Sequence, residues 1–290
     1  MNYSTTSNLV IWIAASLALA GCGGSAGGPG GPGATTSFTK FPLDKGKTAT
    51  LKGTGREATV SEGSAVSAFA SSPVEAELTK DPNSGDISSA TLKTASTTKT
   101  WDHNNSELSY SQNGKLVIAD AKDDSGSVGY ADPEKNGFTY QTYGGWVDQK
   151  GGHAGAFSVG SETAKADIPT SSTATFKGTA GGIVGRPGAG YDVMSADAAL
   201  DVDFGANTAQ FSTSNTTLEA GGAAANLDMS GKLDIASGGL SGNIVTADQS
   251  MSGTADGHFY GSEGQEVGGT FDLKGSGGAL VGGYGAVKQP

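Results

Sequence analysis

The sequence GTADGHFYGSEGQEVGGTFDLKGSGGALVGGYGA at residues 253–286 interleaves glycine with aromatic residues. A strand interior normally avoids glycine, so repeated glycine at inward positions indicates crowding, where a ring from a neighbouring strand fills the space of a side chain. The residues that carry this pattern are Gly253, Gly257, Phe259, Tyr260, Gly268, Gly269, Phe271, Gly282, Gly283 and Tyr284. The pattern predicts a small closed β-barrel.

Alternation of apolar and polar residues extends upstream from this stretch. Between residues 227 and 235 every second residue is apolar or glycine and the residues between them are polar, which predicts a strand with one dry and one wet face. Turn sequences follow at 205–207, 237–239, 262–264 and 275–278. Counting from Thr173 gives about eight short antiparallel strands, the number at which side chains just fill a barrel interior. Residues 170–290 are therefore predicted to form an eight-stranded antiparallel up-and-down barrel.

The region before the barrel, residues 35–165, is less regular and richer in Asp, Asn, Ser and Thr. Period-two segments at 108–110, 116–118 and 138–147 predict strands. We expect a second β unit here, a handle domain, joined to the barrel by a connector at 164–172 that contains Pro169. No convincing amphipathic helix is found, so the predicted fold class is all-β.

The N-terminus has the pattern of an exported lipoprotein. Residues 9–20 (LVIWIAASLALA) form an apolar run typical of a signal peptide and too short for a spanning helix of roughly 20 residues. The next residues complete LAGC at 19–22, which resembles the bacterial lipoprotein cleavage box, and Cys22 is the only cysteine. We expect residues 1–21 to be the signal peptide and Cys22 to carry diacylglycerol and palmitate. The alternative is a plain secretory peptide with an incidental thiol. Residues 1–7 contain no Lys or Arg, so the positive segment that normally begins a signal peptide is missing, which counts against lipidation.

The amino-acid composition indicates a flexible tether and limits the kinds of binding partner that we expect. Residues 22–34 are almost entirely Gly, Pro, Ser and Ala after the cysteine, which is typical of a flexible tether. The chain contains 48 glycines in 290 residues and carries a formal net charge of -11. Because such a charge repels polyphosphate, nucleic acid is excluded as a partner.

Two groups of segments carry a family resemblance. The first group is GFTYQTYGGW at 137–146 with GAFS at 155–158, and the second is FYG at 259–261, EVGGTF at 266–271 and GYGA at 283–286. These segments resemble the β-barrel domain of the transferrin-binding protein B lipoproteins. In that family an aromatic-Tyr-Gly turn leads to a Glu, a Gly-Gly pair and a Phe, and a final strand ends in Gly-Ala and a basic residue, here Lys288.

The resemblance implies a lipoprotein displayed on the Gram-negative outer membrane, with a β handle before an eight-stranded barrel, that binds host proteins or iron sources. This chain has room for a single lobe, as in the factor H binding lipoproteins and the haem scavengers. Ligand loops vary within the family, so the resemblance assigns no ligand residue to this chain.

Ligand-contacting residues are predicted from the chain itself. The segment at 185–191 is long for a hairpin connection and places Arg186 and Tyr191 at one end of a rigid barrel, where binding loops are usually displayed. Tyr143 and Trp146 belong to an aromatic group that either packs in the core between the handle and the barrel or forms a partly exposed contact patch. His153 lies in a predicted loop from which it could reach haem iron, so haem stays an alternative ligand.

The sequence gives little support for metal binding or catalysis. The three histidines are not spaced as zinc ligands, and the carboxylate clusters lack the spacing of a calcium loop. No nucleophile, base and orienting group can be matched, so we expect no enzyme, no metal and no cofactor.

The leading hypothesis is a surface-exposed outer-membrane lipoprotein, anchored by lipid on Cys22, that binds a host protein or a haem-like iron source through barrel and handle loops. The alternatives are an envelope lipoprotein without a nutrient ligand and, more weakly supported, a glycan-acting hydrolase. An export partner for surface display is a further expectation. A barrel without free edges predicts a monomer.

Overall fold

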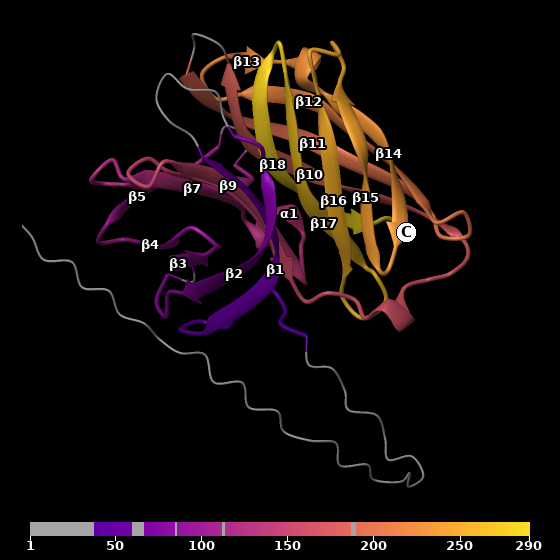
Figure 1. Cartoon of the computed structure of the whole chain (residues 1–290). Coiled ribbons are helices and arrows are strands. Elements are labelled where there is room, and N and C mark those ends of the chain that lie inside the picture. Colours follow the sequence, from indigo (N-terminus) through magenta and orange to yellow (C-terminus); the bar gives the residue numbers. More distant parts are fainter. Residues whose placement is uncertain (1–37, 60–66, 85, 112–113, 187–189) are drawn as a thin grey trace, which may run out of the picture. The chain divides into compact units, whose positions relative to one another are not determined.

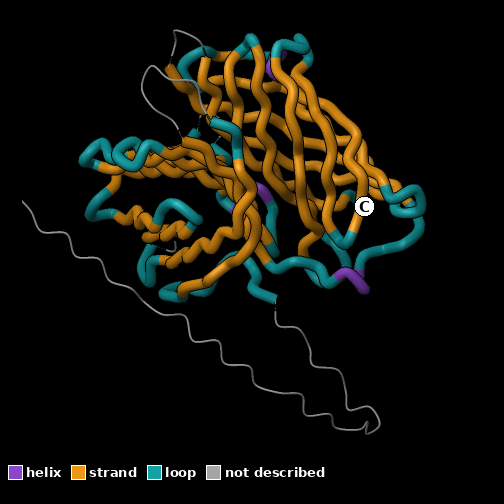
Figure 2. The backbone as a smooth tube through the Cα atoms, viewed as in Figure 1, coloured by secondary structure: helices purple, strands orange, loops and turns teal. Residues whose placement is uncertain are grey.

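The computed structural model describes residues 38–59, 67–84, 86–111, 114–186 and 190–290, and most of this chain is strand (Figure 2). The predicted signal peptide, Cys22 and the tether lie outside the described residues. Residues 38–290 form one compact unit, which contains two nine-stranded antiparallel sheets (Figure 1). Among the described residues, no helix has the length and apolar character needed to cross a membrane.

The N-terminal sheet has the strand order β4-β3-β2-β1-β9-β8-β7-β6-β5. Its strands are β1 (Thr48–Thr59), β2 (Ala70–Lys80), β3 (Ile87–Lys93), β4 (Thr98–Asp102), β5 (Ser106–Tyr110), β6 (Leu116–Ala121), β7 (Gly126–Ala131), β8 (Gln141–Asp148) and β9 (His153–Gly160). The short helix α1 (Pro133–Asn136) connects β7 to β8. The two edge strands of the described sheet, β4 and β5, are consecutive in sequence. Because their short connection holds the two edges near each other, the sheet curls into a nearly closed barrel.

The C-terminal sheet closes completely. Its strands are β10 (Thr173–Arg186), β11 (Gly190–Asp203), β12 (Thr208–Leu218), the two-residue β13 (Gly222–Ala223), β14 (Met229–Ala236), β15 (Gly239–Thr246), β16 (Met251–Tyr260), β17 (Glu266–Gly275) and β18 (Gly278–Lys288). Apart from β13, which pairs only with β12, each strand pairs with its neighbours in sequence, and β18 returns to pair with β10. Of two 3-10 turns, η1 (Lys165–Asp167) precedes β10, and η2 (Ala225–Leu227) lies between β13 and β14. The prediction of an all-β chain with an eight-stranded up-and-down barrel after a β handle is confirmed.

The barrel interior is filled by aromatic and aliphatic side chains, and glycine makes room for them. Phe271 on β17 is paired with Gly282 on β18, where a Cβ atom would lie 2.5 Å from the ring. A Cβ atom on Gly257 would lie 2.4 Å from the hydroxyl of Tyr284. Since real Cβ contacts are much longer, these two glycines are required by the neighbouring rings, as the sequence pattern predicts.

Other glycines let the handle sheet approach the outside of the barrel. A Cβ atom on Gly283 would lie 3.0 Å from Tyr143, and one on Gly285 would lie 2.8 Å from Phe138. The hydroxyl of Tyr143 donates to Thr179 Oγ1 at 2.7 Å. Packing of Tyr143 between the handle and the barrel is one of the two alternatives that the sequence left open, but the sequence pattern placed all of the C-terminal glycines inside the barrel and did not predict their part in this contact.

A buried arginine joins the two sheets. Arg56 on β1 is 8% exposed, and its guanidinium ion-pairs with Asp256 on β16 and Asp272 on β17. It also donates to Thr270 Oγ1 at 3.1 Å and to Thr254 Oγ1 at 2.6 Å. A guanidinium with five fixed donors suits such a cluster of acceptors, so this cluster fixes the handle sheet to two barrel strands.

A second polar contact between the sheets involves Glu266 at the start of β17. Its carboxylate accepts the backbone N–H of Thr139 at 2.5 Å and that of Tyr140 at 3.1 Å. Burial raises the pKa of Glu266 to about 7, although these hydrogen bonds act in the opposite direction.

Candidate binding surface at one end of the barrel

Two predicted contact residues lie at the β10–β11 end of the barrel. Arg186 is the last residue of β10 and pairs with Gly190, and Tyr191 follows with 55% of its surface exposed. The guanidinium of Arg186 lies 3.7 Å from Asp192 Oδ2, and the backbone N–H of Ala220 donates to Asp192 Oδ1 at 3.1 Å. Because strand pairing and these contacts position the backbone, both side chains extend from a rigid base.

The handle hairpin β8–β9 meets this end of the barrel. Gln149 Nε2 donates to the hydroxyl of Tyr191 at 3.0 Å, so a handle loop and a barrel strand are directly joined. Lys150 in the same turn ion-pairs with Asp123 at 2.6 Å. His153, which begins β9 and pairs with Asp148, is half-buried in the same hairpin.

We call this group the loop surface. It combines side chains from the handle with side chains from the barrel, and its members are Gln149, Lys150, His153, Arg186 and Tyr191. The structure thus brings His153 into a hairpin that contacts Tyr191, although the two are far apart in sequence. Gln149 and Lys150 were missed because only the docking of the handle onto the barrel gives them this position.

Tyr143 and Trp146 do not belong to the loop surface. Their side chains are 0% and 1% exposed, and Tyr143 is held by the bond to Thr179. A buried ring cannot touch a protein partner without rearrangement of the core. Their position corresponds to core packing, the first of the two alternatives that the sequence left open.

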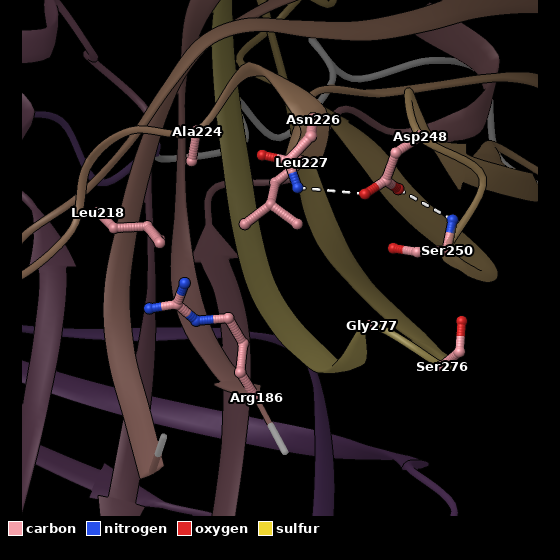
Figure 3. A pocket seen from close by; sticks show the side chains of 9 residues that line it. All are labelled: Arg186, Leu218, Ala224, Asn226, Leu227, Asp248, Ser250, Ser276 and Gly277. Atoms are coloured by element: carbon pink, nitrogen blue, oxygen red, sulfur yellow. Dashed lines mark hydrogen bonds between the residues drawn. The ribbon is translucent and has the colours of Figure 1, made fainter. Parts of the chain in front are cut away.

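A pocket of about 290 Å³ opens at the same end of the barrel (Figure 3). The residues that line it come from the ends of β10 and β12 and from three turns: Arg186, Leu218, Ala224, Asn226, Leu227, Asp248, Ser250, Ser276 and Gly277. Apart from Arg186, sequence reasoning missed them because turn residues of this kind are normally solvated. Only barrel closure brings the three turns together.

Hydrogen bonds organise the acidic side of this pocket. Thr246 Oγ1 and the backbone N–H of Ser250 donate to Asp248 Oδ1 at 2.8 and 2.9 Å. Asn226 Nδ2 donates to Oδ2 at 3.1 Å. Hydrogen bonds from Ser250, Asn226 and Thr246 hold the pKa of Asp248 well below its usual range, so this carboxylate is ionised at neutral pH.

Metal ligands do not gather in the described part of the chain. No three side chains of His, Cys, Asp or Glu among these residues are close enough to share an ion. His258 Nδ1 lies 3.8 Å from a carboxylate oxygen of Glu162, on the connector between the two sheets. At the barrel end, the loop surface and the pocket present hydrogen-bonding groups, charges and the exposed ring of Tyr191.

A closed up-and-down barrel, a handle sheet fixed to its outside and exposed side chains at one end of the barrel together define a class of β scaffolds that present loops. Residues 168–288 match the family described as the C-lobe and N-lobe beta barrels of Tf-binding protein B. The barrel of this chain therefore matches the transferrin-binding protein B barrel family, and the resemblance predicted from the sequence is confirmed.

Solved structures that are similar to this chain include transferrin-binding and lactoferrin-binding proteins. Transferrin Binding Protein B of Haemophilus parasuis is 11% identical, with a TM-score of 0.44, and the alignment covers 86% of this chain and 78% of that one. The Neisseria meningitidis protein is 12% identical with a TM-score of 0.44, covering 85% and 77%. The N-lobe of Lactoferrin Binding Protein B of Moraxella bovis is 10% identical with a TM-score of 0.39, covering 86% and 100%. No curated protein matches the chain significantly, so the family assignment depends on residues 168–288.

Proposed function

We propose that this chain is a surface-exposed outer-membrane lipoprotein that binds a host protein through the loop surface. The observation that carries the proposal is the match of residues 168–288 to the barrels of transferrin-binding protein B, a family named for binding a host protein. Lipid on Cys22 is the proposed anchor, because LAGC at 19–22 follows an apolar signal-like run. The protein acts as a binding module and not as a catalyst.

The composition of the loop surface supports a protein ligand. Tyr and Arg dominate the residues that contribute most to protein–protein affinity, and Tyr191 and Arg186 are the two large side chains displayed at the β10–β11 end. Gln149 fixes the Tyr191 hydroxyl, which lowers the entropy that the ring loses on binding. His153 in the adjoining hairpin is the proposed contact for haem, which stays the alternative ligand.

Protease shaving of intact native cells tests the location. We expect protease to remove the folded body beyond residue 38, while an inner periplasmic protein, the leakage control, stays intact. A Cys22→Ser variant should leave the membrane fraction, since the thiol that receives the lipid is absent. A body that stays protected in intact cells would contradict surface display and favour an envelope partner.

Binding to immobilised host serum proteins tests the loop surface. Tyr191→Ala should weaken a saturable interaction by about tenfold or more, the effect typical of a hot-spot ring. Tyr110→Ala is the matched control, because Tyr110 is 48% exposed on the edge strand β5, outside the loop surface. An equal loss of affinity in both variants, or a loss only in Tyr110→Ala, would contradict the proposal. A separate titration with haem tests the role of His153.

A further inference from the structure

The pocket at the barrel end has a size and lining that differ from those of a flat protein-binding surface. Its volume of about 290 Å³ lies at the lower limit of small-molecule sites, which hold ligands in roughly 300–1,000 Å³. Leu218, Ala224 and Leu227 contribute apolar side chains with little exposure. In Figure 3, Arg186 and Leu218 lie to one side of Leu227, and Asp248, Ser250 and Ser276 lie to the other.

Arg186 has hydrogen-bonding capacity to spare on its side of the pocket. Its side chain is 42% exposed, and its nearest charged partner, Asp192, lies 3.7 Å away, too far for a good hydrogen bond. Asp192 does not line the pocket, and none of the hydrogen bonds found among the described residues uses an Arg186 donor. A partly exposed guanidinium with unused donors is suited to bind a carboxylate through two parallel N–H groups.

Asp248 offers the opposite charge in a fixed orientation. Its two oxygens already accept from Thr246, Ser250 and Asn226, which hold the carboxylate still. A carboxylate has about four acceptor positions, so it can still accept from an ammonium group. The hydroxyls of Ser250 and Ser276 also line the pocket.

We propose that this pocket binds a small zwitterion, an aliphatic amino acid or dipeptide, with its carboxylate on Arg186, its ammonium on Asp248 and its side chain against Leu218 and Leu227. A simple anion would pair only with Arg186 and would be repelled by the net charge of -11 on the chain. A simple cation would leave the guanidinium unused. Only a ligand with both charges complements both walls. The pocket shares Arg186 with the loop surface, but the inference does not need the host-protein ligand proposed above.

Calorimetric titration of the purified full-length protein with leucine and with leucyl-leucine tests the site. Two probes each remove one ligand charge: leucinamide lacks the carboxylate, and N-acetylleucine lacks the ammonium. Each should bind about tenfold or more weakly, because a charged hydrogen-bonding partner is lost. No measurable binding of leucine or leucyl-leucine up to about 10 mM, or equal affinity for the two blocked probes, would overturn the proposal.

Three variants locate the binding. Arg186→Gln should weaken leucine but not leucinamide, and Asp248→Asn should weaken leucine but not N-acetylleucine. Lys177→Gln is the control, because Lys177 is exposed on the same strand as Arg186 but does not line the pocket. Thermal melts verify that each variant folds. Unchanged leucine affinity in either folded pocket variant, or a loss in Lys177→Gln, would overturn the assignment to these residues.

Discussion

Substitution of Arg56 by methionine tests what holds the two sheets together. The substitution keeps an unbranched apolar stem but removes the guanidinium that bonds to Asp256, Asp272, Thr254 and Thr270. Two carboxylates on adjacent barrel strands then face the handle without a cation. The perturbation therefore removes favourable contacts and leaves like charges close together.

The expected cost can be bounded from the burial of the partners. Removing one member of a fully buried ion pair costs about 3–5 kcal/mol, because a charge is left uncompensated. Here the Asp256 and Asp272 side chains are 27% and 20% exposed, so water recovers part of the loss. We expect a decrease of about 2–4 kcal/mol in the free energy of unfolding, or roughly 5–12 °C in the melting temperature of a body of this size.

Thermal melts and urea titrations followed by circular dichroism measure this loss. Lys52→Met is the matched control: Lys52 is exposed on the same strand, and its loss should cost within about 0.5 kcal/mol. Adding Asp256→Asn and Asp272→Asn to the Arg56→Met chain should restore part of the stability, because the uncompensated charges disappear. A cost below about 1 kcal/mol, or further destabilisation by the two Asn substitutions, would refute this account of the cluster.

Two further changes test the packing described above. Burial raises the pKa of Glu266 from 4.5 to about 7, so its contribution to stability is complete below about pH 4.5 and is lost as the pH rises through about 7. Glu266→Gln should remove about 2–3 kcal/mol of this dependence of the unfolding free energy on pH. Thermal melts across the pH range measure the difference. Gly257→Ala places a Cβ atom 2.4 Å from the Tyr284 hydroxyl and 2.6 Å from the Gly268 carbonyl oxygen. It should cost about 1–3 kcal/mol by overpacking, and an unchanged melting temperature would contradict the crowding argument.

The barrel could be predicted from the sequence because its signals are local. Alternation along β14 and the turn residues near 237–239 and 262–264 fix where strands run and where they reverse. In an up-and-down topology each strand pairs with its sequence neighbours, so the strand order follows once the strands are found. Only the pairing of β18 with β10 is non-local, and the crowding of rings against glycine predicts that closure.

The sequence left packing of Tyr143 between the handle and the barrel as one alternative, but the partners in this contact could not be predicted in the same way. Gly283 and Gly285 look like further inward-facing glycines in the sequence, yet they face Tyr143 and Phe138 of the handle. Arg56 and Asp272 lie 216 positions apart, and no periodicity connects them. The candidate site was predicted only in part for the same reason. Arg186 and Tyr191 were predicted from the length of their loop, whereas Gln149 and Asp248 acquire their roles only from the tertiary fold.

The polar cluster around Arg56 and the loop surface are two consequences of the same docking. Gln149 belongs to a handle hairpin and Tyr191 to a barrel strand, so their spacing holds only while the handle sheet stays fixed on the barrel. Fixed spacing lowers the ordering entropy that a partner must overcome on binding. A chain in which Arg56 is replaced should therefore bind a host protein more weakly through Tyr191 even below its melting temperature. The zwitterion pocket, whose lining comes from the barrel alone, should keep its affinity, so the two sites respond differently to one substitution.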